Sequence, residues 1–173
     1  PPIVYDGLGA DIDWWNSNNT LSANWFNATE DISTIYYKYR IFNDTGCYNN
    51  DCNFTVVGTS TSVTVSNLSL LEGERYYFEV VAFNPFGLNS SAVSNGVQLD
   101  LTKPDAPLIN SSTHPDQSVP SATQIAIFNF TATDPTFYEE SGTEGYSYVL
   151  DTHAGTAPDN IMEEREWHVL SSL

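Results

Sequence analysis

Apolar and polar residues alternate with a period of two along most of this chain, and the alternating runs are broken by Gly, Pro, Asn and Asp. Successive side chains of a β-strand point to opposite faces of a sheet, so this alternation is typical of strands that are buried on one side. The spacing of three to four residues that marks an amphipathic helix is nearly absent. The pattern therefore predicts an all-β fold.

Seven strands are expected in the first hundred residues, where turn signals are frequent. Their ranges are Ile12–Trp15, Leu21–Trp25, Ile35–Phe42, Phe54–Val57, Ser62–Val65, Arg75–Phe83 and Ala92–Gln98. Short strands in this number and at this spacing favour an antiparallel β-sandwich. In the clearest strand, one face is predicted to be core and carries Tyr76, Phe78, Val80 and Ala82.

The charge balance excludes two classes of partner. Lys and Arg total 5 and Asp and Glu total 22, which gives the 173 residues a net charge of −17. Proteins that bind nucleic acid or dock on an anionic membrane need a basic surface, so neither partner is expected. Hydrophobic residues make up 40% of the chain, too many for a disordered tail, and no apolar run is long enough for membrane insertion of this segment.

Acceptor sites for N-glycosylation, Asn-x-Ser/Thr, occur more often than the composition predicts. Chance would give roughly three. The chain has eight, at Asn18, Asn27, Asn43, Asn53, Asn67, Asn89, Asn110 and Asn129. The excess favours an extracellular cell-surface protein that carries N-linked glycans, although a β-protein rich in Asn, Ser and Thr can also form such sites by accident.

The two cysteines, Cys47 and Cys52, enclose the polar run Tyr-Asn-Asn-Asp. A disulfide that closes this short loop would contribute roughly 2 kcal/mol to stability. It would also imply an oxidising compartment outside the cytosol. Two free thiols are the alternative, whereas a zinc site would need more ligands, and no histidine lies in the first hundred residues.

One segment carries a family resemblance. Gly73–Gly87 reads Gly-Glu-Arg-Tyr-Tyr-Phe-Glu-Val-Val-Ala-Phe-Asn-Pro-Phe-Gly. It resembles the sixth strand and following loop of fibronectin type III domains, where the pattern is Gly-x-x-Tyr-x-(aliphatic or Phe)-x-Val-x-Ala-x-Asn-x-x-Gly. Trp25 matches the second-strand tryptophan of that family and Tyr37–Tyr39 matches its third strand. The resemblance covers about residues 10–100.

The resemblance implies an immunoglobulin-like sandwich whose sixth strand lies between the third and the seventh. Leu68–Leu71 precede Tyr76 as the corner of that family does, so the Tyr76 hydroxyl is expected to bond to the upstream backbone. Tandem copies of this kind resemble those of archaeal and bacterial surface proteins. Function is not implied, because such modules serve as spacers, adhesive units and display platforms in unrelated proteins.

A weak internal repeat predicts a second unit of the same kind. Residues 1–100 would form the first sandwich, the proline-containing stretch 101–107 a linker, and residues 108–173 the second unit. In that second unit Phe130 takes the place of Trp25. The strands expected there are Leu108–Asn110, Gln124–Ala132, Tyr146–Leu150 and Glu166–Val169.

The second unit is expected to lack its last two strands, because no second Tyr-x-Phe-x-Val-x-Ala segment follows. Residues beyond Leu173 are the favoured completion, and a strand inserted by a neighbouring chain is the alternative. The opening Pro1–Val4 has neither a basic region nor an apolar signal core, so we expect a mature or excised piece.

Catalysis is not expected, because no nucleophile elbow, zinc-protease motif or phosphate loop is present. Carboxylates on loops could hold Ca²⁺, although solvated acids that keep the protein soluble are the favoured interpretation. These carboxylates are Asp6, Asp11, Asp13, Asp100, Asp105, Asp134, Glu139 and Glu140.

The outward faces of two strands are unusually apolar and suggest a contact surface. An exposed aromatic band around two cations is typical of protein–protein contacts, with the same chain or with neighbouring domains. The residues of this expected surface are Tyr36, Lys38, Arg40, Phe42, Tyr77, Val81 and Phe83. Sugar binding and shielding by glycan are the alternatives.

These observations favour a non-enzymatic, glycosylated structural or adhesive module of a cell-surface or filament protein. An accessory module of a secreted hydrolase is one alternative, and a ligand-binding adhesin or receptor ectodomain is another. No cofactor is expected beyond the possible Ca²⁺.

Overall fold

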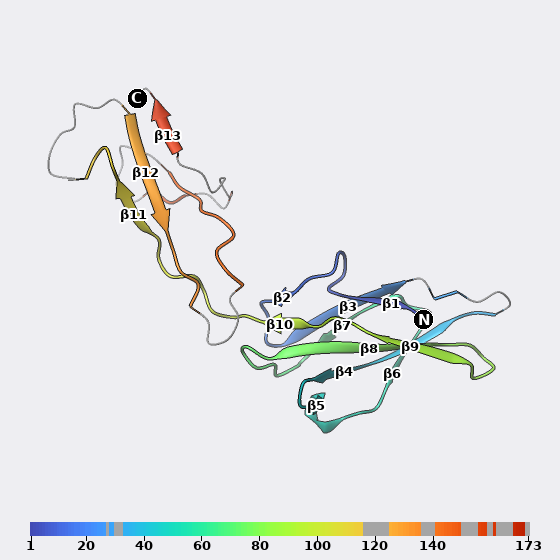
Figure 1. Ribbon diagram of the computed structural model, residues 1–173. Helices are drawn as coiled ribbons and strands as arrows, with labels where there is room; N and C mark the ends of the chain where they lie inside the picture. Colours follow the sequence, from blue (N-terminus) through green and yellow to red (C-terminus); the bar gives the residue numbers. More distant parts are fainter. Residues whose placement is uncertain are drawn as a thin grey trace. The chain divides into compact units, whose positions relative to one another are not determined.

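The computed structural model describes residues 1–26, 28–29, 33–115, 125–135, 141–149, 156–158, 161 and 168–171. The protein is all-β: in the described residues the only helical element is a single 3-10 turn at Tyr48–Asn50. The chain divides into two compact units, the first comprising Pro1–Leu101 and the second beginning at Thr102. Each unit is described by itself (Figure 1).

The first unit contains a small antiparallel sheet with the order β1–β3–β7. Its strands are β1 (Ile3–Asp6), β3 (Thr20–Phe26) and β7 (Ser62–Ser66). The central strand β3 pairs with both neighbours. Its pattern of buried and half-buried residues places Leu21, Ala23 and Trp25 on the inner face.

The larger sheet has seven strands in the order β2–β10–β8–β4–β5, with β6 also paired to β4 and β9 to β8. Its strands are β2 (Trp14–Trp15), β4 (Tyr36–Asn43), β5 (Gly46–Cys47), β6 (Thr55–Gly58), β8 (Arg75–Phe83), β9 (Asn89–Val93) and β10 (Val97–Leu99). The sheet is mixed, because β2 runs parallel to β10.

The two sheets bury one shared hydrophobic core, an arrangement consistent with a β-sandwich. Trp25 in the small sheet is only 1% exposed, and its ring lies 5.8 Å from that of Tyr37 in the large sheet. The core face predicted for β8 is confirmed, since all four of its alternate residues are buried: Tyr76, Phe78, Val80 and Ala82.

Two strand predictions in the first unit were wrong. The first strand was expected at Ile12–Trp15, but β1 (Ile3–Asp6) pairs with β3, and only Trp14–Trp15 is extended, against β10. The last strand was expected to run unbroken to Gln98. It is split into β9 and β10, because Ser94 and Gly96 leave the ladder and Gly96 takes a φ of +90°. A Cβ there would overlap the Tyr77 ring, so only glycine fits.

The described residues of the second unit contain one antiparallel sheet with the order β11–β12–β13. Its strands are β11 (Leu108–Ser111), β12 (Ile125–Thr131) and β13 (His168–Ser171), close to three of the predicted ranges. The strand expected at Tyr146–Leu150 is not extended over residues 146–149, which hold an isolated bridge at Tyr146. Leu150 lies outside the described residues.

The sheet of the second unit repeats the pairing of the small sheet at a constant offset of 105 positions. Val4 lies opposite Trp25 in the first unit, and Ile109 lies opposite Phe130 in the second. The other edge repeats in the same way, with Ala23 opposite Val63 and Phe128 opposite His168. The strand order and register of β1–β3–β7 therefore recur in β11–β12–β13.

Candidate contact face on the seven-stranded sheet

The outward side chains of β4 and β8 form what we call the contact face: Tyr36, Lys38, Arg40, Phe42, Tyr77, Val81 and Phe83. Antiparallel pairing places Tyr36 opposite Phe83, Lys38 opposite Val81, and Phe42 opposite Tyr77. The structure therefore brings all seven residues together on one face, as their alternation predicts.

The expectation that this face exposes Val81 was wrong. Val81 is buried, with 7% of its surface exposed, and the other six residues are half-buried. The reason is that β8 is a central strand: β4 pairs with it on one side, and β9 and β10 pair with it on the other. Val81 consequently sits between Lys38 and Ser91.

On the contact face two aromatic rings stack, and the cations lie over aromatic rings. Phe42 and Tyr77 are stacked with their ring centroids 5.1 Å apart. The Lys38 ammonium lies 4.9 Å from the Phe54 ring centroid and 5.9 Å from that of Phe83. A cation over an aromatic ring gains about 0.5–1 kcal/mol at a solvent-accessible site. Phe54, which the sequence placed in a strand but not on this face, therefore belongs to it.

The two cations of the face differ in how their charge is balanced. Arg40 donates from Nε to Glu79 at 2.8 Å, its Nη2 pairs with the same carboxylate at 2.6 Å, and its guanidinium lies 4.8 Å from the Phe54 ring centroid. Within the described residues Lys38 forms no ion pair. Lys38 is therefore the cation on this face that can accept a carboxylate from a partner.

Two exposed valines extend the contact face at its sides, and the sequence analysis did not single them out. Val56 on β6 lies opposite Lys38, and Val93 on β9 lies opposite Glu79. Both side chains are exposed. Strand pairing carries the signal that could have found them, because a residue directly opposite an outward residue shares its face.

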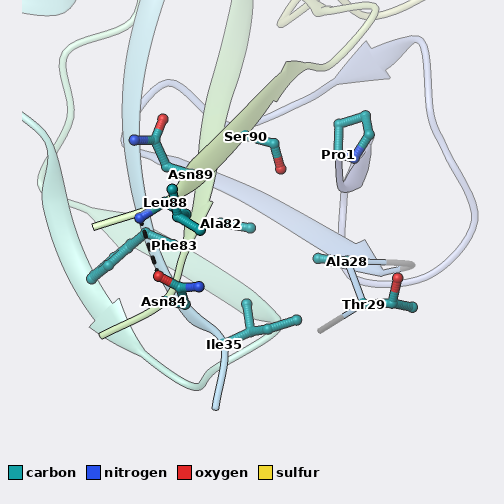
Figure 2. Close-up of a pocket in the computed structure, with 10 residues that line it drawn as sticks. All are labelled: Pro1, Ala28, Thr29, Ile35, Ala82, Phe83, Asn84, Leu88, Asn89 and Ser90. Carbon is teal, nitrogen blue, oxygen red and sulfur yellow. Dashed lines mark hydrogen bonds between the residues drawn. The ribbon is translucent and has the colours of Figure 1, made fainter. Parts of the chain in front are cut away.

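The β8–β9 hairpin forms one end of this region, and a hollow of about 220 Å³ lies between it, Pro1 and the segments at Ala28 and Ile35. The buried Asn84 side chain accepts hydrogen bonds from the backbone N–H groups of Phe86 and Leu88, which fixes the turn. Figure 2 shows Leu88 and Asn89 on one side of the hollow and Pro1 on the other. Phe86, at the tip of the Asn-Pro-Phe-Gly turn, is 74% exposed, and the sequence did not predict this exposure.

The seven sequons whose asparagine the structure describes lie at exposed or half-buried positions. Asn18, Asn53, Asn67, Asn89 and Asn110 are exposed, Asn43 and Asn129 are half-buried, and Asn27 lies outside the described residues. Two of them border the contact face: Asn89 lies opposite Phe83, and Asn53 directly precedes Phe54. The Asn43 amide donates to Glu74, and a glycan on this nitrogen would leave one N–H for that bond.

The disulfide between Cys47 and Cys52 is present and fixes a loop beside the sandwich. Asn49 and Asn50 in this loop have φ values of +51° and +59°, in the left-handed region that asparagine tolerates. The Tyr48 hydroxyl accepts a 2.6 Å hydrogen bond from the Ser69 N–H. The loop is thereby attached to the segment that precedes β8.

The bond expected at Tyr76 is also present. The Leu71 N–H donates to the Tyr76 hydroxyl at 3.0 Å, so two tyrosines, Tyr48 and Tyr76, accept from the same short segment. Their rings meet edge to face at 6.3 Å. This corner closes the end of the unit near the disulfide.

The carboxylates considered for Ca²⁺ are not gathered into a site where the structure describes them, because no group of three or more acids, histidines or cysteines occurs there. Asp11 instead accepts from the Asp6 N–H at 2.9 Å. Asp105 accepts from Thr133 and Asp134 from Ser141. Glu139 and Glu140 lie outside the described residues, and Asp13 and Asp100 join no such group.

Asp6 is a buried carboxylate with a structural partner. Its Oδ2 accepts from the Gly96 N–H at 3.0 Å, and Ser94 also bonds to the carboxylate. Burial raises the pKa of Asp6 to about 6, because removal from water penalises the charged form more than these two bonds favour it. Asp6 thus joins β1 to the link between β9 and β10.

No family model matches the chain, and no curated protein matches it. The residues that the structure describes include no helix long and apolar enough to cross a membrane. The function is therefore argued from the contact face, the sequons and the repeated sheet.

Proposed function

We propose that the chain is a non-enzymatic, extracellular structural module of a glycosylated surface or filament protein, built from fibronectin type III-like units. The observation that carries the proposal is the contact face, in which Lys38 lies between the rings of Phe54 and Phe83 on a chain of net charge −17. A cation framed by aromatic rings suits a protein contact, since aromatic residues are enriched in interface cores.

Strand order supports the fibronectin type III-like assignment of the first unit. Apart from the two-residue strands β2 and β5, the third strand in chain order is β4 and the sixth is β8, and they are paired. The segments that follow, β9 and β10, pair with the other edge of β8. The hydrogen bond from Leu71 to Tyr76 matches the corner that the family resemblance implies.

The test of the contact face is self-association of the whole chain, measured by sedimentation velocity over a range of concentrations. Lys38→Glu reverses the charge that the aromatic rings frame and should weaken association at least about tenfold. Lys103→Glu makes the same change of charge at an exposed position outside the contact face and should leave association unchanged. Association that is insensitive to Lys38→Glu would contradict a role for this face.

Glycosylation is tested separately by the intact mass of the native protein before and after deglycosylation. We expect a mass loss that corresponds to several occupied sequons, with the exposed Asn53 and Asn89 among them. Chain made in a host that does not glycosylate should fold but be less soluble, because the aromatic region near Phe83 loses its cover. An unchanged mass would remove the glycoprotein part of the proposal.

A ligand-binding adhesin is the second candidate, and the β8–β9 hairpin favours it. Phe86 and Leu88 are both exposed on this hairpin, and Leu88 lines the hollow of Figure 2, an arrangement that suits capture of a ligand. The Phe86→Ser, Leu88→Ser double variant would abolish adhesion to a surface under this function and leave self-association unaffected. An accessory role beside a secreted hydrolase has no specific observation in its favour.

A further inference from the structure

The link between β9 and β10 contains the one Asn-Gly pair of the chain, Asn95–Gly96. The backbone nitrogen that follows an asparagine can attack the carbon of the side-chain amide, and glycine hinders this attack least because it has no side chain. Asn95 is exposed, and its side chain forms no hydrogen bond within the described residues. Asn-Gly-Val is not a glycosylation sequon, so no N-linked glycan occupies the Asn95 amide.

The packing of the first unit requires glycine after Asn95. Gly96 is buried and has a φ of +90°. A Cβ at this position would lie 2.4 Å from an atom of the Tyr77 ring, and the Gly96 carbonyl already accepts a 3.0 Å hydrogen bond from Arg75. The unhindered nitrogen beside Asn95 is therefore a consequence of the fold, because a larger residue does not fit there.

Asp6 lies where the attack on Asn95 would have to take place. The Gly96 N–H donates to Asp6 Oδ2 at 3.0 Å, and the Asp6 side chain is fully buried. In a cyclic imide the amide carbon takes the place of the hydrogen on the planar nitrogen. The Asp6 oxygen thus occupies the direction from which Asn95 Cγ would approach, and it blocks the reaction while this hydrogen bond is intact.

We propose that Asn95 is a self-modification site that the Asp6 carboxylate holds closed, and that it reacts when the hydrogen bond from Gly96 to Asp6 opens. Hydroxide removes the Gly96 N–H proton, and the nitrogen forms a bond to Asn95 Cγ. The bond between Cγ and Nδ2 breaks, and ammonia leaves with a proton from water. Water then opens the imide at either carbonyl, which leaves aspartate or isoaspartate at position 95.

Modification would change the link irreversibly. Just before Asn95, the Ser94 N–H donates to the Phe78 carbonyl at 2.9 Å, and Ser94 Oγ accepts from the Phe78 N–H at 3.0 Å. An isoaspartate adds a methylene group to the backbone between this attachment to β8 and the contacts of Gly96, so both cannot be kept. We expect the modified chain to unfold at a lower urea concentration than the parent. The inference goes beyond the proposed function and does not depend on the contact face.

The test is the rate at which Asn95 is converted in the full 173-residue chain at mildly alkaline pH, followed by peptide mapping with mass spectrometry. Asp6→Ala removes the acceptor and should accelerate conversion at least about tenfold, because a hydrogen bond to a charged group no longer opposes opening. Asp6→Val is a second variant without an acceptor, and its apolar side chain suits the buried position. Circular dichroism checks that each variant is folded.

Two variants are the controls. Asp6→Asn keeps an acceptor for the Gly96 N–H and should convert residue 95 at a rate near that of the parent. It creates a second Asn-Gly pair with Gly7, which the peptide map resolves from the pair at residue 95. Ile41→Val removes a buried methylene group from β4, so it lowers stability without touching the link and should leave the rate unchanged.

Three results would overturn the proposal. The first is conversion that is no faster in Asp6→Ala and Asp6→Val than in Ile41→Val. The second is slower conversion in Asp6→Asn than in the parent, since the carboxylate would then assist the reaction as a base. The third needs no variant: Asn95 in the folded parent should convert at least about tenfold more slowly than in the urea-unfolded parent, and equal rates would show that the site is not held closed.

Discussion

Val4 and Ile109 occupy the same position of two sheets with the same strand order and register, and yet one is buried and the other exposed. The comparison shows that pairing strands does not by itself remove an apolar face from water. Burial requires a second layer, which the large sheet supplies in the first unit. A matching sequence pattern therefore predicts the sheet, but it does not predict whether the apolar face of that sheet is buried.

The largest expected effect is a loss of unfolding free energy when the central aromatic residue of a unit is removed, and this loss should differ between the two units. Trp25→Ala should cost about 3–5 kcal/mol of unfolding free energy, because the side chain is fully enclosed. Phe130→Ala should cost roughly half as much, because its ring is only half-buried. Urea denaturation followed by circular dichroism measures both values.

Phe86→Ala is the control for these two variants, since the exposed ring should change stability by less than about 0.5 kcal/mol. If Phe130→Ala proved as costly as Trp25→Ala, the face of the second unit would be as well covered as that of the first, and the comparison would fail.

The pH effect expected from Asp6 has no counterpart in the second unit, because the residue at the offset of 105 is Ser111. The pKa of Asp6 is raised from 3.8 to about 6, so the folded state binds more protons than the unfolded state between these values. This group therefore lowers the unfolding free energy as the pH rises from about 4 to 6, by about 3 kcal/mol at most.

Asp6→Asn keeps an acceptor for the Gly96 N–H and removes the titration. The unfolding free energy of the variant minus that of the parent chain should be near zero at pH 4. This difference should increase in favour of the variant up to pH 7. Denaturation curves of both proteins at a series of pH values give this difference. A difference that does not change with pH would mean that the Asp6 carboxyl has an ordinary pKa in the folded state.

A smaller effect follows from the disulfide, which also distinguishes the units, since the second has no cysteine. Replacing Cys47 and Cys52 together by serine should lower the stability of the first unit by roughly 2 kcal/mol, because the loop regains freedom in the unfolded state. Thermal unfolding with and without a reductant provides the measurement. Alkylation without reduction should label neither cysteine of the parent chain, and two labelled thiols would disprove the bond.

The smallest effect is expected at the tyrosine corner. Tyr76→Phe keeps the buried ring and removes the acceptor for the Leu71 N–H, so it should cost about 1 kcal/mol. Chemical denaturation should rank it well below Trp25→Ala. The reverse ranking would imply that the strand register is shifted by one residue, which exchanges core and surface along β8.

Alternation was sufficient to predict β3, β4, β7 and β8 and the core face of β8, because these strands have one buried and one outward side. It missed β1, which is short and follows two prolines. It also predicted that Val81 is a surface residue. This prediction was wrong because alternation carries no information about the flanking strands that bury Val81.

The contact face was predictable as a set of residues, whereas its detailed contacts were not. Phe54 and Val56 reach it from β6 and the preceding loop through pairing with β4, and the sequence does not specify which strands become neighbours. Phe86 stands in the loop that follows the strand in the family resemblance, and that motif does not indicate how far its ring is exposed. The described residues of the second unit form one sheet, and no local pattern encodes the exposure of Ile109 on it.

The most direct test of the account is amide hydrogen exchange measured on β3 and β12 in the same chain. Both are the central strands of their three-stranded sheets, so pairing alone would protect them equally. We predict that the amides of Thr20–Phe26 exchange at least about a hundredfold more slowly than those of Ile125–Thr131. Equal protection of the two strands would contradict the account.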